Sequence, residues 1–390
     1  MKRNYPVGIQ NFEKIRNGNY CYIDKTDLIY QLIKSGQYYF LSRPRRFGKS
    51  LLISTLEAYF QGKKELFEGL AIEQLEKEWI EYPILHLDLN AQKYDTPESL
   101  YSILNNALCI WESLYGSRPS ETNLSLRFQG VIQRAAEKWN RPVVILIDEY
   151  DKPMLQAIGN EPLLNDYRNT LKAFYSVMKS CDKYIQFALL TGVTKFSKVS
   201  VFSDLNNLMD ISIDNRFANI CGTTEKELLS NFKEDIVELG QKNGMTEEET
   251  KAYLKDMYDG YHFVEYGDDI YNPFSLLNTF AKMKFGSYWF ESGTPTFLVE
   301  LLKHSEYDLH RLTEEMTSAD SLGGIDTMYS NPIPILYQSG YLTIKGYDKE
   351  FQVYYLGFPN KEVEEGFTKF LLPCYAHLQT GNKRHREMDC

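Results

Sequence analysis

The stretch from Tyr38 to Phe60 constrains the fold of this chain more than any other. An apolar, aromatic run at 38–41 is typical of a buried strand, and a helical run follows at 51–60. Between them lies the loop Ser42-Arg43-Pro44-Arg45-Arg46-Phe47-Gly48-Lys49-Ser50. A strand, a loop ending in Gly-Lys-Ser and a helix form an arrangement that holds phosphate groups, because the N–H groups at the helix start point towards them.

The loop therefore predicts a site for a nucleoside triphosphate with Mg²⁺. Lys49 would neutralise the β- and γ-phosphates, and Ser50 would place its hydroxyl on the metal. The full pattern requires glycine five residues before Gly48, where this chain has Arg43. A Gly-Lys-Ser sequence before a helix is also an ordinary helix start with a serine cap, so the loop alone does not decide the function. The residues expected to contact the nucleotide are Arg45, Arg46, Phe47, Gly48, Lys49, Ser50 and Leu51.

A second element further along the chain supports the same interpretation. Residues 143–147, Val-Val-Ile-Leu-Ile, form a continuous apolar run that is typical of a strand buried on both faces. The run ends in Asp148-Glu149-Tyr150-Asp151, at the strand end where α/β sheets place ligands. We expect Asp148 to hold Mg²⁺ and Glu149 to orient or deprotonate the attacking water. A strand that simply ends in a polar loop is the alternative, and the presence of both elements in this order favours nucleotide binding.

Two other predicted strands end in polar residues. The strand at 184–194 ends near Thr191, which we expect to sense the γ-phosphate, with Thr194 as the weaker candidate. The alternative is that threonine simply suits strands. The strand at 82–90 carries Asp88 at its carboxyl end, where a solvated strand end is favoured over a residue that faces the phosphates.

Strands separated by helices predict an α/β fold, a P-loop parallel sheet with helices on both faces. An extra strand between the P-loop strand and the acidic strand, and a glutamate after the aspartate, are typical of the additional-strand, catalytic-glutamate kind of P-loop fold. A fifth strand is predicted at 208–213, and two late strands at 335–344 and 353–360 resemble a winged-helix module. The predicted domains are the P-loop domain at 1–215, a helical lid at 216–285, a winged-helix-like domain at 286–378 and a disordered tail at 379–390.

Charge and cysteine content narrow the class of protein. The net charge of −10 argues against a surface coated by nucleic acid, and the predicted winged-helix strands carry few basic residues. The six cysteines include no Cys-x-x-Cys pair, which predicts a reduced compartment without disulfides or structural metal. No secretory signal and no apolar run of about 18 residues is present, so we expect a cytoplasmic protein that does not contact membrane.

Five motifs together resemble the AAA-ATPase-like family over roughly residues 5–375. The Arg43 departure is in keeping with that family, whose loop typically reads Arg-Pro-Arg-Arg-Phe-Gly-Lys. Members commonly carry a C-terminal nuclease-like domain of the PD-(D/E)xK type. No such motif follows residue 360 here, so nuclease activity is not expected. The five motifs are residues 42–50, 147–153, 190–198, 258–261 and 271–274.

Together the residues and the resemblance predict an ATP-binding protein, a slow Mg²⁺-dependent ATP hydrolase that acts as a molecular switch, with Glu149, Lys49 and Thr191 as its catalytic residues. One alternative is a nucleotide-gated regulatory or scaffold protein with little turnover. Another is a DNA-associated module left from a nuclease-bearing ancestor. The expected partners are ATP and an unidentified protein, and a homo-oligomer is left open. Weak candidates for an arginine finger from a neighbouring subunit are Arg45, Arg46 and Arg216.

Overall fold

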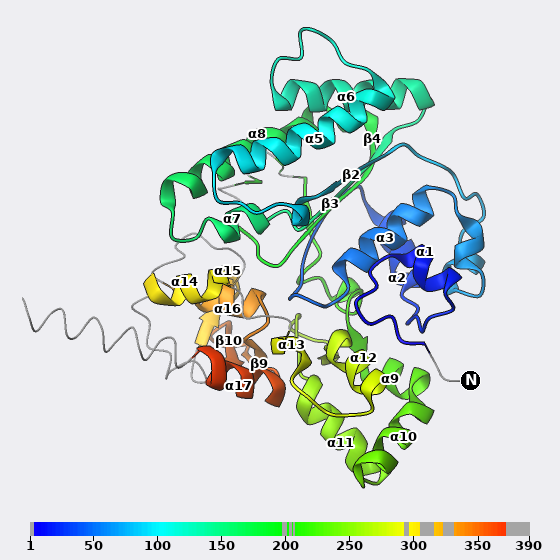
Figure 1. Ribbon diagram of the computed structural model, residues 1–390, viewed down its shortest axis with the longest axis vertical. Coiled ribbons are helices and arrows are strands. Elements are labelled where there is room, and N and C mark those ends of the chain that lie inside the picture. Colours follow the sequence, from blue (N-terminus) through cyan, green and yellow to red (C-terminus); the bar gives the residue numbers. More distant parts are fainter. Residues whose placement is uncertain are drawn as a thin grey trace, which may run out of the picture. The chain divides into compact units, whose positions relative to one another are not determined.

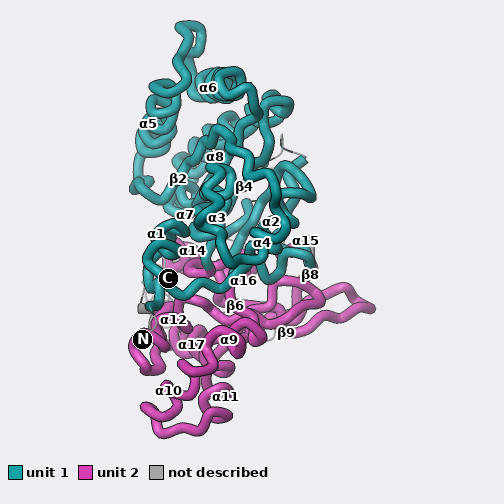
Figure 2. The backbone as a smooth tube through the Cα atoms, turned by 90° about the vertical axis from the view of Figure 1, so that its right-hand side faces the viewer, with its two compact units in different colours: residues 1–43, 48–221 teal, residues 44–47, 222–390 magenta. Residues whose placement is uncertain are grey.

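A computed structural model describes residues 4–196, 201–202, 205, 207–291, 296–304, 316–322 and 331–371. The chain divides into two compact units, drawn in different colours in Figure 2. The first unit comprises residues 1–43 and 48–221, and the second comprises 44–47 and 222–390. The separation of a lid from a winged-helix-like domain within the second unit stays a prediction, and the tail at 379–390 lies outside the described residues.

The first unit is built on a five-stranded sheet in the order β2-β3-β4-β1-β5 (Figure 1). All of its strand pairs are parallel, which confirms the predicted α/β fold. The additional strand predicted between the P-loop strand and the acidic strand is β4, which lies between β1 and β3 in the sheet. Strand β5 is shorter than the strand predicted at 208–213. The strands are β1 (Tyr38–Ser42), β2 (Ile84–Asp88), β3 (Val143–Asp148), β4 (Ile185–Gly192) and β5 (Met209–Asp210).

Helices cover both faces of this sheet, as predicted. On one face α3 contacts β3 and β4, with α1 packed against it, while α5, α6 and α8 pack together over the other face (Figure 1). Stacked rings of Phe128 and Phe174, with centroids 4.3 Å apart, join α6 to α8. The helices are α1 (Phe12–Asn17), α2 (Thr26–Ser35), α3 (Lys49–Phe60), α4 (Ala71–Leu75), α5 (Pro97–Tyr115), α6 (Leu124–Trp139), α7 (Lys152–Gln156) and α8 (Glu161–Ser180).

The second unit begins with helices around a short antiparallel pair, β6 with β7. Thr224 and Glu227 form a capping box at the start of α9. Asn272 caps α12 by accepting the N–H groups of Phe274 and Ser275. These elements are β6 (Thr223–Thr224), α9 (Glu225–Asn231), α10 (Lys233–Asn243), α11 (Glu247–Tyr258), β7 (Ile270–Tyr271), α12 (Pro273–Lys282), α13 (Tyr288–Glu291) and α14 (Thr296–His304).

The rest of the second unit contains a three-stranded antiparallel sheet in the order β8-β10-β9. The predicted strand at 335–344 is wrong in its first half, which is helix α16. Pro334 lies in the first turn of this helix, where its fixed φ favours helix over strand. The elements are β8 (Met316–Ser318), α15 (Ala319–Leu322), α16 (Ile333–Gln338), β9 (Thr343–Asp348), β10 (Val353–Gly357) and α17 (Lys361–Gly366).

Candidate functional site

The site begins at the N-terminus of α3, where the chain leaves β1 and turns into the helix. Gly48 precedes the helix with φ of 95°, a left-handed conformation that favours glycine. A Cβ at this position would meet no heavy atom within 4 Å, so the backbone and not crowding selects glycine. The first N–H groups of a helix lack intrahelical partners and carry the positive end of its dipole. Ser50 and Leu51 lie half-buried in this first turn.

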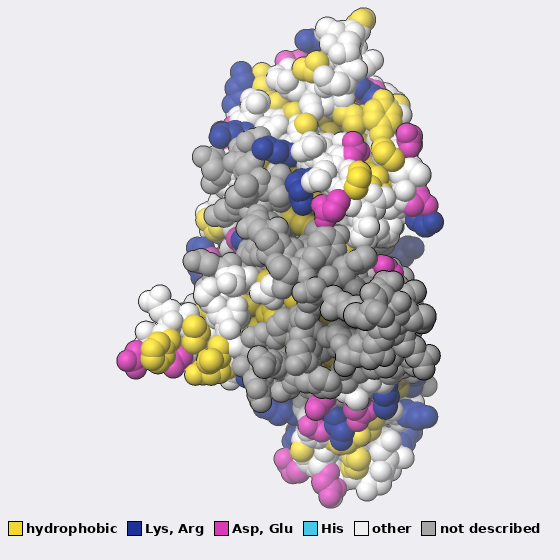
Figure 3. Space-filling model, turned by 90° about the vertical axis from the view of Figure 1, so that its left-hand side faces the viewer, with side chains coloured by type: hydrophobic (Ala, Val, Ile, Leu, Met, Phe, Trp, Pro, Cys, Tyr) yellow, Lys and Arg dark blue, Asp and Glu magenta, His cyan; other side chains and the backbone are white. Residues whose placement is uncertain are grey.

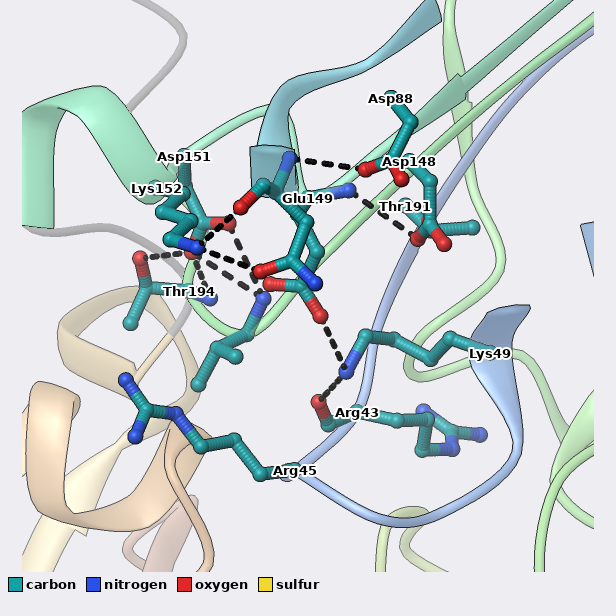
Figure 4. A network of polar contacts seen from close by, with 12 residues as sticks. Arg43, Arg45, Lys49, Asp88, Asp148, Glu149, Asp151, Lys152, Thr191 and Thr194 are labelled. Carbon is teal, nitrogen blue, oxygen red and sulfur yellow. Dashed lines mark hydrogen bonds and ion pairs between the residues drawn. The ribbon is translucent and has the colours of Figure 1, made fainter. Parts of the chain in front are cut away.

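Lys49 is a buried cation at this helix start, with 4% of its side chain exposed. Its Nζ donates to the carbonyl of Arg43 at 3.0 Å and lies 3.7 Å from Oε1 of Glu149 (Figure 4). Glu149 follows the last residue of β3, so the lysine and the acidic motif meet at the carboxyl ends of the strands. The two motifs that the sequence analysis combined therefore lie within contact distance.

Asp148 and Thr191 join neighbouring strands at this end of the sheet. Thr191 is fully buried in β4, and its hydroxyl donates to Oδ1 of Asp148 at 2.6 Å (Figure 4). The same oxygen accepts the N–H of Glu149 at 3.0 Å. These two donors fix the orientation of the Asp148 carboxylate. The predicted role of Thr191 as a sensor of the γ-phosphate stays a prediction, and in the structure its hydroxyl contacts the Asp148 carboxylate at 2.6 Å and the Ile147 carbonyl at 3.5 Å.

Glu149 has a φ of 55°, which is uncommon for a residue other than glycine. Such conformations persist where the surroundings determine them, and they concentrate at functional sites. About a fifth of the Glu149 side chain is exposed, whereas Lys49 is buried. Glu149 is therefore the acidic residue that combines contact with the lysine and access to solvent.

Asp151 is a buried carboxylate to which the sequence analysis gave no role. It accepts the N–H and the hydroxyl of Thr194, each at 2.6 Å, and the N–H of Val193 at 3.1 Å. Its burial, reinforced by the charge of Glu149, raises the pKa of Asp151 to about 6. Asp151 thus ties the segment after β4 to the segment after β3. The hydroxyl of Thr194, the weaker candidate for the γ-phosphate sensor, is therefore occupied by its hydrogen bond to Asp151.

Arg43 occupies the position where the full loop pattern has glycine, and only 1% of it is exposed. Its guanidinium donates to the carbonyls of Ser42 at 3.0 Å, Ser212 at 2.8 Å and Ala218 at 3.3 Å. The arginine therefore anchors the segment that follows β5. This structural role accounts for the departure from the pattern, and sequence reasoning missed it.

Of the remaining candidates, Asp88 lies beside Asp148 in the register of β2 with β3. Asp88 is exposed, and its Oδ1 accepts the N–H of Asn90 at 2.7 Å, as expected of a solvated strand end. Arg216 pairs with Asp214 at 2.6 Å. Three of the residues predicted to contact the nucleotide belong to the second unit, namely Arg45, Arg46 and Phe47.

The residues present fit a magnesium-bound phosphate better than a protein-caged metal. Within the described part of the chain, no group of three or more His, Cys, Asp or Glu is arranged to hold a metal ion. Mg²⁺ is commonly held by one or two carboxylates together with waters and substrate phosphates, which suits Asp148 and Ser50. No helix among the described residues is both long enough and apolar enough to cross a membrane.

Comparison with known proteins agrees with this geometry. A family described as predicted AAA-ATPase matches residues 6–202. The chain belongs to this family. The match includes β1, the loop, α3, the acidic motif and β4, and membership of the predicted AAA-ATPases implies nucleotide binding.

A relative extends the similarity beyond the matched region. A protein of Azotobacter chroococcum mcd 1, described as an uncharacterized protein in the vnfD 5' region, is 38% identical over 389 residues. These residues cover 97% of this chain and 73% of that protein, so the relative shares sequence with both units of this predicted AAA-ATPase. No solved structure matches the chain.

Proposed function

We propose that the protein binds ATP with Mg²⁺ at the N-terminus of α3 and hydrolyses it slowly, acting as a molecular switch. The observation that carries the proposal is the 3.7 Å approach of Lys49 to Glu149 at the strand ends. It unites a buried phosphate-binding cation with a carboxylate that solvent can reach. Family membership supports nucleotide binding, and hydrolysis is inferred from the acidic motif.

Each residue of the cluster has a distinct part in this proposal. Lys49 neutralises the β- and γ-phosphates. To reach its ammonium, the phosphates must displace Glu149 and the Arg43 carbonyl. Once the lysine binds phosphate, the Glu149 carboxylate is released to orient a water and take its proton. Asp148, fixed by Thr191, would hold Mg²⁺ together with Ser50.

Electrostatic stabilisation supplies most of the rate enhancement in this account. Phosphoryl transfer spreads negative charge over the phosphate oxygens, and Mg²⁺ held by Asp148 and Ser50 would neutralise part of it. A cation held in a buried position acts more strongly there than in water, because its surroundings do not need to reorganise. Lys49 meets this condition, since its ammonium is fixed on two partners and nearly excluded from solvent.

The direct test of nucleotide binding is calorimetry with Mg²⁺ and ATP on wild type and Lys49→Ala. We expect the substitution to lower the affinity by about tenfold or more, because it removes a charge-assisted contact to phosphate. Lys138→Ala serves as the matched control, since Lys138 is an exposed lysine on α6 that donates to the Leu114 carbonyl. Equal affinity of wild type and Lys49→Ala would show that the loop does not bind the nucleotide.

The alternative of a DNA-associated module has little support in the described surface. On the face drawn in Figure 3, Lys and Arg side chains lie interspersed with Asp and Glu. Strands β9 and β10 carry a single basic residue, Lys345, whose ammonium donates to the Pro359 carbonyl at 2.9 Å. A cytoplasmic location, a protein partner and a homo-oligomer stay predictions.

A further inference from the structure

The phosphate-binding loop is divided between the two compact units. Residues 44–47, Pro-Arg-Arg-Phe, belong to the second unit, whereas Arg43 and Gly48 on either side belong to the first (Figure 2). The peptide bonds before Pro44 and after Phe47 are therefore direct covalent links between the units. Any force that the second unit exerts on residues 44–47 acts on the backbone next to Gly48.

Phe47 anchors this segment in the second unit. Only 1% of it is exposed, and its ring makes edge contacts with Tyr261 at 4.7 Å and Phe263 at 5.6 Å. Its carbonyl accepts the N–H of Gly222 at 3.2 Å. The ring is thus held in an aromatic cluster by residues that lie far along the chain.

Both arginines of the segment also have partners in the second unit. The indole of Trp289 donates to the carbonyl of Arg45 at 3.1 Å, and the Arg45 guanidinium lies over the ring of Phe297 at 5.4 Å. The Arg46 guanidinium lies over Phe274 at 4.8 Å. Arg45 and Arg46 are exposed residues, and these contacts attach their guanidinium groups and the Arg45 backbone to the second unit.

The backbone of the segment adopts a conformation that needs such support. Arg46 has a φ of 69°, a left-handed conformation that is unfavourable for a residue with a Cβ. Pro44 lies so close to Gly340 that a Cβ on that glycine would approach the proline ring to 2.7 Å. The contacts of Phe47, Arg45 and Pro44 with the second unit hold this unfavourable turn in place.

We propose that the second unit sets the conformation of the phosphate-binding loop, with Phe47 and Trp289 as positioning residues for the nucleotide. The inference rests on the proposed function, because it assumes that the loop binds phosphate. A loop arranged in advance binds more tightly, since less ordering remains to be done on binding. Coupling of this kind is reciprocal, so a nucleotide that orders the loop must also act on the surroundings of Trp289.

Tryptophan fluorescence tests the coupling from the side of the second unit. The chain has four tryptophans, and Trp289 and Trp111 are similarly buried, at 5% and 6% exposure. We expect ATP with Mg²⁺ to change the emission of wild type and of Trp111→Phe, whose tryptophan lies on α5 of the first unit. Trp289→Phe should lose this change and bind ATP about tenfold more weakly, because the Arg45 carbonyl loses its donor. Unchanged emission response and affinity in Trp289→Phe would overturn the inference.

A second pair of variants distinguishes a role of Phe47 in positioning the loop from a general loss of protein stability. Phe47→Leu removes the aromatic anchor of the loop, and Phe280→Leu removes a ring of equal burial that stacks on Phe232 within the second unit. We expect both variants to lose comparable stability, whereas only Phe47→Leu speeds hydrogen exchange at the amides of residues 48–51 and weakens ATP binding about tenfold. Phe47→Tyr, which keeps the ring, should restore part of the affinity.

The outcomes distinguish this inference from the proposed function. If wild type binds ATP and Lys49→Ala does not, but Phe47→Leu matches Phe280→Leu in affinity and exchange, the inference alone is wrong. If wild type binds no ATP, the proposed function is wrong and the inference falls with it. The exchange of amides 48–51 is measured without nucleotide, and equal exchange in the two variants contradicts positioning in either case.

Discussion

The Asp148 carboxylate is buried at the end of β3 and accepts the Thr191 hydroxyl at 2.6 Å. Together with the Glu149 N–H, this hydroxyl leaves the carboxylate little freedom to rotate. A metal ligand that is already oriented loses less entropy when the metal binds. At the scale of single residues, Thr191 therefore orients the Asp148 carboxylate, whether or not it also contacts phosphate.

Thr191→Val tests this role with little change in shape. We expect the concentration of Mg²⁺ needed for half-maximal turnover to rise, and turnover to fall by about tenfold, because a hydrogen bond to a charged group is lost. Thr55→Val is the matched control, since Thr55 is a buried threonine on α3 whose hydroxyl donates to the Leu51 carbonyl at 2.8 Å. An unchanged Mg²⁺ dependence in Thr191→Val would contradict the assignment.

Some site residues could be predicted from the sequence, and others could not. Lys49, Asp148 and Glu149 stand in short motifs at strand ends, so their proximity follows from the parallel arrangement of the strands. The role of Arg43 depends on a carbonyl 169 residues away, and a backbone carbonyl leaves no mark on the sequence. Asp151 was overlooked because nothing in a run of acidic residues tells which member turns inward.

At the scale of elements, the turn from the loop into α3 depends on Gly48. Alanine at this position would have room but would have to adopt a φ near 95°. We expect Gly48→Ala to lower the free energy of unfolding by about 1 kcal/mol. It should also weaken ATP binding, because the N–H groups at the helix start shift when the strain is relieved. Urea denaturation and calorimetry measure the two effects.

Gly69 offers a matched control for this prediction. It has a φ of 75°, and a Cβ there would likewise meet nothing within 4 Å, but it lies between Phe67 and α4 and not in the loop. Gly69→Ala should cost similar stability and leave ATP binding unchanged. Equal ATP affinities in the two variants would show that the left-handed turn at Gly48 is structural only.

The elements that the sequence predicts well are long and have local start signals. Helix α5 occupies 97–115, with Pro97 in its first turn and Gly116 following its end, and both signals can be read from the sequence. Two short elements were misjudged, the two-residue β5 and the helix α16. The extent of β5 is decided by its pairing with Tyr39 and Phe40 of β1. The alternation of apolar and polar residues at 208–213 does not show how many of them pair.

At the scale of the whole molecule, the division of the loop between two units is the feature that sequence reasoning could not supply. A continuous motif was expected to belong to one domain, but residues 44–47 cluster with the second unit. The contact of Trp289 with Arg45 joins residues 244 positions apart, and no local pattern predicts it.

The most direct test of the central claim is ATP turnover with Mg²⁺, measured for wild type beside Glu149→Gln, with calorimetric binding recorded on the same samples. Glu137→Gln, at an exposed position of α6, controls for the loss of one carboxylate. The account predicts that Glu149→Gln lowers turnover by about 100-fold or more while ATP binding persists, because only the acceptor of the water's proton is removed. Binding without turnover in wild type would favour a nucleotide-gated scaffold, and wild-type turnover in Glu149→Gln, or no binding by wild type, would contradict the account.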